Sequence, residues 1–382
     1  MRPAASHDHE SEAIHAMSIP DPAIPATTTS SPKPPDLVSL PTDIQPSVRP
    51  VERVVTFGEA MVRLTPPGNE RLERTVSLDV TVGGAELNAA IGLECLGIPT
   101  AWVSALPENA LGRMIARQAR ASGVDTSSIH WMSEDKGRCG VYFLEEGVDP
   151  RPSSVTYDRK NTAIANVQPG TFDWRAILRG ASALHISGIT LAISKGARAE
   201  AMEAVRVASE TGVLVSFDLN YRSKLWSEAE ARAAFVEIIP FVDILFASRG
   251  GLETFYGITG SHDDVMKQAI ERLGVAAVTI TRKRTKGSRR LKVQSMALGP
   301  SGVLATSDWR DLEVVDRLGG GDAYAAGFLA GYLENPAALT KAVALGTAAS
   351  ALKHTMPGDF LCATREEIEA VAFSASSAIL QR

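Results

Sequence analysis

Short apolar runs alternate with helical stretches from residue 51 onward, and this alternation limits the possible folds more than any other feature of the chain. The apolar runs are "RVVTFGE", "TAWVSAL", "ALHISGI", "GVLVSFDL", "VDILFAS" and "AAVTIT". The stretches between them, such as "AELNAAIGLECLG" and "HDDVMKQAIERLG", often end in glycine, as helices commonly do. This order predicts an α/β fold with a mostly parallel sheet covered by helices on both faces. Since ligands bind such sheets at the carboxyl ends of the strands, we expect the chemistry in the loops that follow strands.

Two segments, 61–84 and 137–166, depart from this alternation. Each has the pattern of two β-strands joined by a proline-rich turn, which predicts a hairpin. Both follow the end of a predicted strand of the main sheet. We therefore expect a small β-sheet that projects from the main domain and covers the ligand-binding edge as a lid.

Composition separates a tail from the domain and excludes some classes of function. Residues 1–50 hold ten of the 21 prolines, so we expect a disordered tail before a single domain over 51–382. A net charge of -5 gives no electrostatic basis for binding nucleic acid. No apolar run approaches the roughly 20 residues of a membrane span. Three scattered cysteines without disulfide or metal-ligand spacing, and no secretory signal, predict a cytoplasmic protein.

The stretch "DRLGGGDAYAAGF" (316–328) is the strongest candidate for a site. We interpret residues 312–316 as a strand and 323–333 as a helix, linked by a loop that contains three glycines and Asp322. Free backbone N–H groups at a helix start favour an anion, and glycine lets that anion approach closely. By itself the motif fits either a helix capped by Asp322 or a general base beside a phosphate cradle.

Two further loops carry polar residues at predicted strand ends. In "VGGAELN" the glycine pair allows a small ligand to approach the backbone, and Asn88 follows within one helical turn. In "VSFDLNYRSKLW" a buried strand ends in Asp218, Asn220 and Arg222, and arginine pairs well with a carboxylate or a phosphate. Taken alone, the first loop could be a tight strand–helix turn and the second a surface arginine.

These motifs together resemble a known family. "GGAELNAAIGLECLG" and "DRLGGGDAYAAGF" are similar, in order and separation, to the two signatures of the PfkB (ribokinase-like) carbohydrate kinases. "FGEAMVRLTPPG", "FDLNYRSKLW" and "ALKHTMPGDF" resemble its 2-keto-3-deoxygluconate kinase branch. The resemblance covers 51–382 and implies a ribokinase-like three-layer α/β/α sandwich with a mostly parallel central sheet and a small β-sheet lid. It also implies phosphate transfer from ATP with Mg²⁺ to a primary hydroxyl, C6 of 2-keto-3-deoxygluconate, and a homodimer formed through the lid.

The resemblance also assigns roles to residues at matching positions. Asp322 would be the general base, and the anion hole would consist of Gly319, Gly320 and Gly321. The sugar would contact Gly84, Ala85 and Asn88, and an acid sugar would also contact Tyr157, Arg159 and Arg222, with Tyr142 as a further lid residue. The nucleotide would lie near Asn220, Ser248, Lys286 and Gly287. Asp316 would lie near a loop that binds a monovalent cation such as K⁺, if this branch uses one.

The chain departs from the family pattern at three places. Arg317 stands where the family usually has threonine, and Ser248 and Gly251 stand in place of its metal-linked Asn-x-x-Glu pair, with Glu253 two residues later. The usual Gly-x-x-Gly nucleotide loop is replaced by the basic stretch 281–292, which we expect to be a solvated hairpin that helps to bind ATP phosphates. Three alternatives stay open: a kinase for a neutral sugar, a regulatory protein that binds sugar and nucleotide without turnover, and nucleic-acid binding by the basic stretch.

Overall fold

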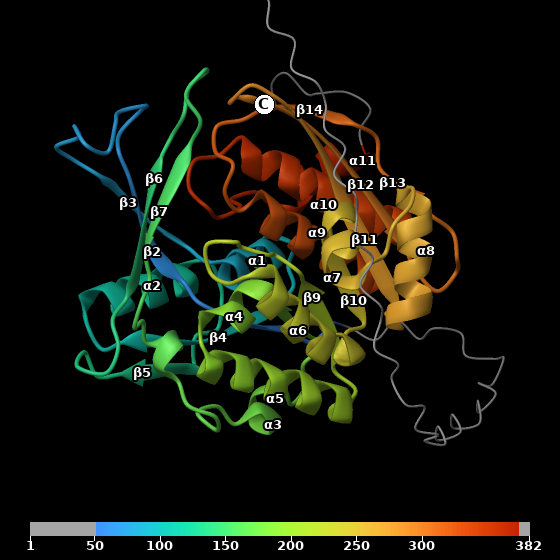
Figure 1. The fold of residues 1–382 in the computed structure, drawn as a ribbon, viewed down its shortest axis with the longest axis horizontal. Coiled ribbons are helices and arrows are strands. Elements are labelled where there is room, and N and C mark those ends of the chain that lie inside the picture. The colour runs from blue at the N-terminus through green and yellow to red at the C-terminus, as the bar shows by residue number, and fades with distance from the viewer. Residues whose placement is uncertain (1–50, 374–382) are drawn as a thin grey trace, which may run out of the picture. The chain divides into compact units, whose positions relative to one another are not determined.

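The fold is built on one large, mostly parallel β-sheet. The computed structural model describes residues 51–373, so the predicted tail and the last nine residues of the predicted domain lie outside the described part. The sheet has ten strands in the order β13-β12-β11-β10-β9-β8-β1-β4-β5, with β14 paired to β12 (Figure 1). From β11 to β5 all neighbours are parallel, whereas β12 is antiparallel to β11, β13 and β14. The strands are β1 (Val54–Phe57), β4 (Thr100–Pro107), β5 (Ile129–Met132), β8 (Ala183–Ser187), β9 (Leu214–Asp218), β10 (Ile244–Ala247), β11 (Ala277–Lys286), β12 (Arg290–Leu298), β13 (Ala305–Thr306) and β14 (Arg310–Glu313).

Helices cover both faces of this sheet and complete three layers, as predicted. One face packs against α1 (Ala85–Cys95), α2 (Ala110–Ala121), α9 (Gly320–Glu334), α10 (Leu339–His354) and α11 (Arg365–Phe373). The other packs against α3 (Trp174–Ile177), α4 (Gly188–Ile193), α5 (Lys195–Thr211), α6 (Glu228–Ile238), α7 (Arg249–Tyr256) and α8 (His262–Leu273). Two 3₁₀ turns, η1 (Ile164–Asn166) and η2 (Ile239–Phe241), lie in connecting segments. Within residues 51–373, none of these helices is both long and apolar enough to cross a lipid bilayer.

The apolar runs of the sequence are continuous because their strands are buried on both faces. Successive side chains of a strand point to opposite faces of the sheet. Val55 packs with the α5 and α6 side of the core, whereas its neighbour Val54 packs with the α9 and α10 side. Leu245 and Phe246 divide in the same way. An apolar residue is therefore needed at every position of these strands rather than at every second one.

A separate four-stranded sheet consists of the two segments that interrupt the alternation (Figure 1). It has the order β3-β2-β6-β7, with strands β2 (Met61–Thr65), β3 (Asp79–Gly83), β6 (Gly140–Glu145) and β7 (Ser154–Asp158). The hairpins β2–β3 and β6–β7 are antiparallel, and β2 and β6 join them in parallel. The predicted small sheet is thus present, while its action as a lid and its pairing between two copies stay predictions.

The structure corrects the prediction for the segment before the glycine run. The predicted strand 312–316 is instead the edge strand β14, which ends at Glu313 and pairs antiparallel with β12. Helix α9 begins at Gly320, three residues before the predicted start at 323. Glycine has a poor helix propensity, so the sequence pattern placed these residues outside the helix. In the structure they form its first turn.

Candidate active site

Each of the three consecutive glycines is required, or tolerated, for a different structural reason. Gly319 is the N-cap of α9 with a φ of 76°, a left-handed conformation that favours glycine, and a Cβ there would collide with the carbonyl oxygen of Asp359. A Cβ at Gly320 would collide with the buried ring of His354. At Gly321 a Cβ would meet nothing, because this residue faces open space. The first two glycines therefore allow close packing, and the third leaves room for a ligand.

The start of α9 is an anion-binding arrangement. No side chain in the described part of the chain, 51–373, caps this helix, so its first N–H groups and the positive end of the helix dipole are available to an anion. Asp322 is not the cap, because Gly319 holds that position and Asp322 is the third residue of the helix. The Oδ2 atom of Asp322 instead accepts a hydrogen bond of 2.7 Å from Nδ2 of Asn88 on α1. This contact excludes the interpretation of Asp322 as a plain helix cap.

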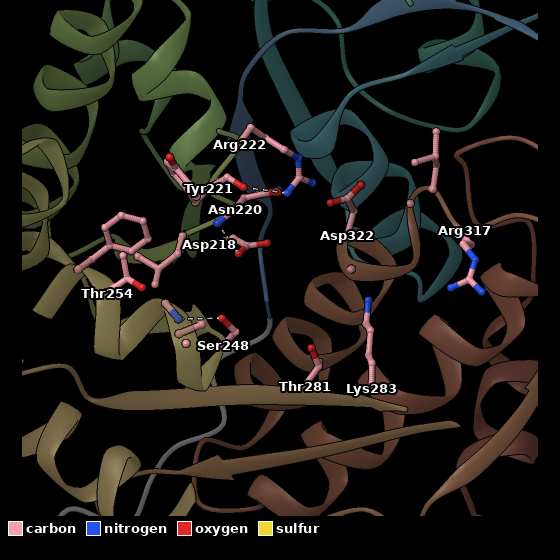
Figure 2. A pocket seen from close by; sticks show the side chains of 18 of the residues that line it. Asp218, Asn220, Tyr221, Arg222, Ser248, Thr254, Thr281, Lys283, Arg317 and Asp322 are labelled. Carbon is pink, nitrogen blue, oxygen red and sulfur yellow. Dashed lines mark hydrogen bonds between the residues drawn. The ribbon is translucent and has the colours of Figure 1, made fainter. Parts of the chain in front are cut away.

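A pocket of about 510 Å³ lies beside Asp322, at the carboxyl ends of β9, β10 and β11 (Figure 2). This is the edge of the sheet where the fold class predicts a ligand. Of the residues predicted to take part, the structure brings six to its wall: Asn220, Arg222, Ser248, Gly319, Gly321 and Asp322. Gly320 belongs to the same helical turn but packs behind it against His354.

Two carboxyl groups of the pocket have raised pKa values. Burial raises the pKa of Asp322 to about 6, although the Asn88 hydrogen bond and the charges of Arg222 and Lys283 oppose the shift. Burial and the negative charge of Asp322 raise the pKa of Asp218 to about 7, while Arg222 lowers it. Figure 2 shows Arg222 and Lys283 directed toward Asp322 from different walls. A pKa of about 6 leaves Asp322 mostly ionised near neutral pH, and the side chains of Arg222 and Lys283 favour this ionised form.

Lys283 lines the pocket, although the sequence analysis named Lys286 rather than Lys283 from the basic stretch 281–292. It projects from β11 into the pocket, where the surrounding protein lowers its pKa and the charges of Asp322 and Asp218 raise it. The predicted nucleotide contacts Lys286 and Gly287 are not among the residues that line the pocket. Successive side chains of a strand point to opposite faces, and this pattern separates Lys283 from Lys286. Thr281 and Lys283 are on the face of β11 that lines the pocket, and Lys286 is not.

Two other basic residues of this hairpin pack against Trp309, and Arg317, which also lines the pocket, binds the hairpin turn. Arg282 and Arg284 point to the opposite side of β11, where their guanidinium groups lie 5.2 and 4.5 Å from the ring centre of Trp309. Arg317, the unexpected residue of the glycine motif, donates from Nε and Nη2 to the carbonyl oxygen of Ser288, at 3.1 and 2.7 Å. It also donates to the carbonyl oxygen of Gly287 at 3.0 Å. Arg317 thus attaches the hairpin turn to the loop before α9.

The predicted sugar-side residues meet on the other side of Asp322. Asn88 links α1 to Asp322, and Gly84 packs directly on the backbone of Glu59, while Ala85 begins α1. Arg159 forms an ion pair with Glu59, which is buried after β1. Tyr157 is 38% exposed on β7, with the Arg159 guanidinium 5.7 Å from its ring centre. The positive charge of Arg159 is therefore already matched by a carboxylate.

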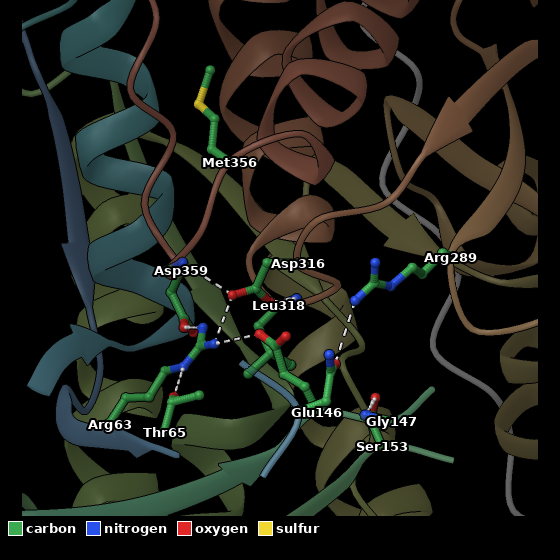
Figure 3. Close-up of polar contacts among 12 residues, drawn as sticks. Arg63, Thr65, Glu146, Gly147, Ser153, Arg289, Asp316, Leu318, Met356 and Asp359 are labelled. Atoms are coloured by element: carbon green, nitrogen blue, oxygen red, sulfur yellow. Dashed lines mark hydrogen bonds and ion pairs between the residues drawn. The ribbon is translucent and has the colours of Figure 1, made fainter. Parts of the chain in front are cut away.

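Tyr142 and Asp316 are two further predicted residues, and both are buried. Tyr142 is only 3% exposed, and its hydroxyl lies with the Asp359 carboxylate against Gly83 below the small sheet. Its ring centre lies 5.9 Å from that of Tyr157, and its predicted contact with the sugar stays a prediction. Asp316 is also buried, and its carboxylate forms an ion pair with Arg63 at 2.7 Å (Figure 3).

Ser248 and Gly251, which stand at the positions of the family's metal-linked Asn-x-x-Glu pair, form a helix cap instead. Oγ of Ser248 accepts a hydrogen bond of 3.0 Å from the N–H of Gly251 at the start of α7. Glu253 lies further along α7 and is not among the pocket residues. Within residues 51–373 no group of three or more His, Cys, Asp or Glu side chains is placed to hold a metal ion. The carboxyl groups that line the pocket belong to Asp218, Glu228 and Asp322.

Comparisons with known proteins agree with one another. Residues 51–366 match the pfkB family carbohydrate kinases. A 2-dehydro-3-deoxygalactonokinase from Haloferax volcanii is 35% identical over 318 residues, which are 83% of this chain and 96% of that protein. A 5-dehydro-2-deoxygluconokinase from Geobacillus kaustophilus is 28% identical over 74% of this chain and 81% of that protein. The crystal structure of a 2-dehydro-3-deoxygluconokinase from Thermotoga maritima is 37% identical and superposes with a TM-score of 0.81, covering 84% of this chain and 99% of that one.

The glycine run gives a prediction with an internal control. Gly320→Ala should lower the free energy of unfolding by about 1–3 kcal/mol, because the new methyl group collides with the His354 ring. Gly321→Ala should leave it unchanged or raise it by up to about 1 kcal/mol, since its methyl group meets open space in a helical turn. Urea unfolding of both variants measures the difference. Equal effects at the two positions would contradict the packing described here.

Proposed function

The chain belongs to the pfkB family of carbohydrate kinases, and from this membership we propose that it transfers the γ-phosphate of ATP to C6 of 2-keto-3-deoxygluconate. As a sugar kinase it uses a nucleoside triphosphate and a divalent metal ion. The observation that carries the proposal is the arrangement around Asp322, where a carboxylate, free helix N–H groups and two cations meet at one pocket. The three relatives described above are all kinases of deoxy sugar acids by name, which supports the choice of an acid sugar.

Asp322 is the general base in this proposal. The Asn88 hydrogen bond fixes the orientation of its carboxylate, and a pKa of about 6 keeps it ionised at neutral pH. It takes the proton of the sugar hydroxyl as the hydroxyl oxygen bonds to the γ-phosphorus. The bond from that phosphorus to the oxygen bridging to the β-phosphate breaks, and ADP leaves with that oxygen.

Positive groups of the chain accept the charge of the transferred group. The N–H groups of the first turn of α9 stabilise the phosphoryl oxygens, as the amides of an oxyanion hole do. Lys283 contacts the γ-phosphate from the opposite wall, which extends the nucleotide site that the sequence placed at Asn220 and Ser248. A magnesium ion bound with ATP would supply further charge neutralisation, and its preference for oxygen ligands and water fits the Asp218 carboxylate in the same wall.

Arg222 recognises the carboxylate of the sugar acid. Within residues 51–373 it forms no ion pair, and its guanidinium has a single hydrogen bond, to the carbonyl oxygen of Tyr221 at 3.3 Å. Arg159, by contrast, is already paired with Glu59. Of the two arginines that the resemblance assigned to the acid sugar, Arg222 is thus the one without an ion-pair partner within residues 51–373.

The role of Asp322 predicts the effect of one substitution and of pH. Asp322→Asn should lower kcat by about 10²–10⁴-fold, with ATP affinity and the free energy of unfolding retained. In the unsubstituted protein kcat/KM should fall as pH drops below about 6, because protonation removes the base, and should level off above it. Steady-state kinetics over a pH series measures both. Near-normal turnover of Asp322→Asn would rule out this base.

The role of Arg222 is tested with two substrates that differ only at C1. Arg222→Ala should raise KM for 2-keto-3-deoxygluconate by about 10–100-fold, the loss of a charge-assisted hydrogen-bonded pair. It should leave KM for 3-deoxyfructose, which carries a hydroxymethyl group in place of the carboxylate, unchanged. ADP release measures turnover of both compounds and of the C4 epimer 2-keto-3-deoxygalactonate. An equal loss for acid and neutral substrate would assign Arg222 to the phosphates, and preferred turnover of the neutral sugar would overturn the acid substrate.

The pocket face of β11 predicts which lysine contacts ATP. Lys283→Met should weaken the binding of a non-hydrolysable ATP analogue about tenfold more than that of ADP, because only the analogue has a γ-phosphate. Lys286→Met, at the position that the resemblance indicated, should leave the ratio of the two affinities unchanged. Isothermal titration calorimetry gives both affinities. If Lys286→Met weakened the binding of the ATP analogue more than that of ADP and Lys283→Met did not, Lys286 would be the lysine that contacts the γ-phosphate.

A further inference from the structure

A buried arginine connects three distant segments behind the glycine run (Figure 3). Arg63 lies on β2 of the small sheet, and its side chain is 3% exposed. Its Nη2 atom is 2.7 Å from Oδ2 of Asp316, and its Nη1 atom is 2.8 Å from Oδ1 of Asp359. Nε donates to Oγ1 of Thr65 at 3.0 Å, and Glu146 lies 3.8 Å from Nη2. The guanidinium therefore has a partner at each of its nitrogen atoms.

The Asp316 carboxylate contacts Arg63 and two backbone N–H groups. Its Oδ1 atom accepts a hydrogen bond from the N–H of Leu318 at 3.0 Å, and its Oδ2 atom accepts one from the N–H of Gly358 at 3.0 Å. The same Oδ2 atom meets Arg63. The resemblance places a K⁺-binding loop near Asp316, and in this chain the Asp316 carboxylate already has Arg63 as its positive partner.

A second buried cation lies on the other side of the same loop. Lys353 on α10 is fully buried, and its Nζ atom donates to the carbonyl oxygen of Met356 at 3.2 Å. Its Cε atom lies 3.2 Å from the position that a Cβ on Gly319 would take. Burial lowers the pKa of Lys353, and the charges of Asp316 and Asp359 raise it. Arg63 and Lys353 thus lie close to the carboxylates of Asp316 and Asp359 around the segment that leads to the glycine run, with Glu146 also near Arg63.

We propose that Arg63, with Lys353 beside it, holds the loop from Asp316 to Gly321 in its anion-binding shape, in the place where a bound monovalent cation would otherwise act. Both are positioning residues, because neither lines the pocket. Arginine suits this role since its guanidinium keeps its charge and pairs with two carboxylates at fixed angles. The proposal rests on the chain being a sugar kinase, and it holds for any sugar that the protein accepts. Turnover is accordingly independent of K⁺ and Na⁺.

The first test uses the unsubstituted protein with KCl or tetramethylammonium chloride at equal ionic strength. The kcat should agree within about twofold, and the midpoint of thermal unfolding should be the same in both salts. A rise of kcat of about tenfold or more on adding K⁺, or a higher unfolding midpoint in K⁺, would overturn the proposal. The unfolding measurement needs no substrate, so it stays decisive even if 2-keto-3-deoxygluconate is not phosphorylated.

The second test removes the arginine and offers a replacement ion. Arg63→Ala should lower kcat by about 10²-fold through displacement of the glycine loop. Added K⁺ or guanidinium should restore part of kcat and raise the unfolding midpoint of this variant, because either ion can occupy the vacated position between Asp316 and Asp359. Arg71→Ala, which removes an exposed arginine of the β2–β3 connection, should change neither quantity. If Arg63→Ala folds and neither ion restores turnover, the proposal is wrong, and if it does not fold, the first test decides.

Discussion

The contact on which the active-site geometry depends is the buried pairing of Arg63 with Asp316 and Asp359. Taking such charges out of water is costly, so an apolar cluster of the same size could be equally stable, but removing one partner leaves an unmatched charge at a cost of about 3–5 kcal/mol. The pairing fixes the relative positions of three segments of the chain. It connects the small sheet to the loop before α9 and to the loop after α10, and the glycine run lies between these two loops.

The site itself is a balance of like and opposite charges in a partly closed space. Asp218 and Asp322 face the pocket, and Glu86 lies behind them, where burial raises its pKa and Ser187 and Thr190 donate to its carboxylate. A nucleotide brings further negative charge to these carboxyl groups. In the proposed mechanism the start of α9 and Lys283 offset that charge. Lys283 and Arg222 also lower the pKa of Asp322 against the effect of burial.

The departures from the family pattern have structural explanations in this chain. Arg317 holds the turn of the β11–β12 hairpin through the carbonyl oxygens of Gly287 and Ser288. The basic residues of that hairpin separate by strand alternation, with Lys283 toward the pocket and Arg282 and Arg284 toward Trp309. A stretch that looks like one positive patch in the sequence therefore has two faces with different partners.

The sequence by itself determined what depends on neighbours along the chain. Apolar runs such as Val54–Phe57 predicted a doubly covered sheet, and the loops that hold Asp322 and Asn220 predicted the ligand-binding edge, because periodicity and backbone preference act over a few residues. The tertiary structure decided that Arg159 pairs with Glu59, that Tyr142 is buried, that Lys283 rather than Lys286 faces the pocket, and that Arg63 meets Asp359 across 296 residues. No local pattern encodes these contacts, since they depend on where folding brings distant charged side chains together.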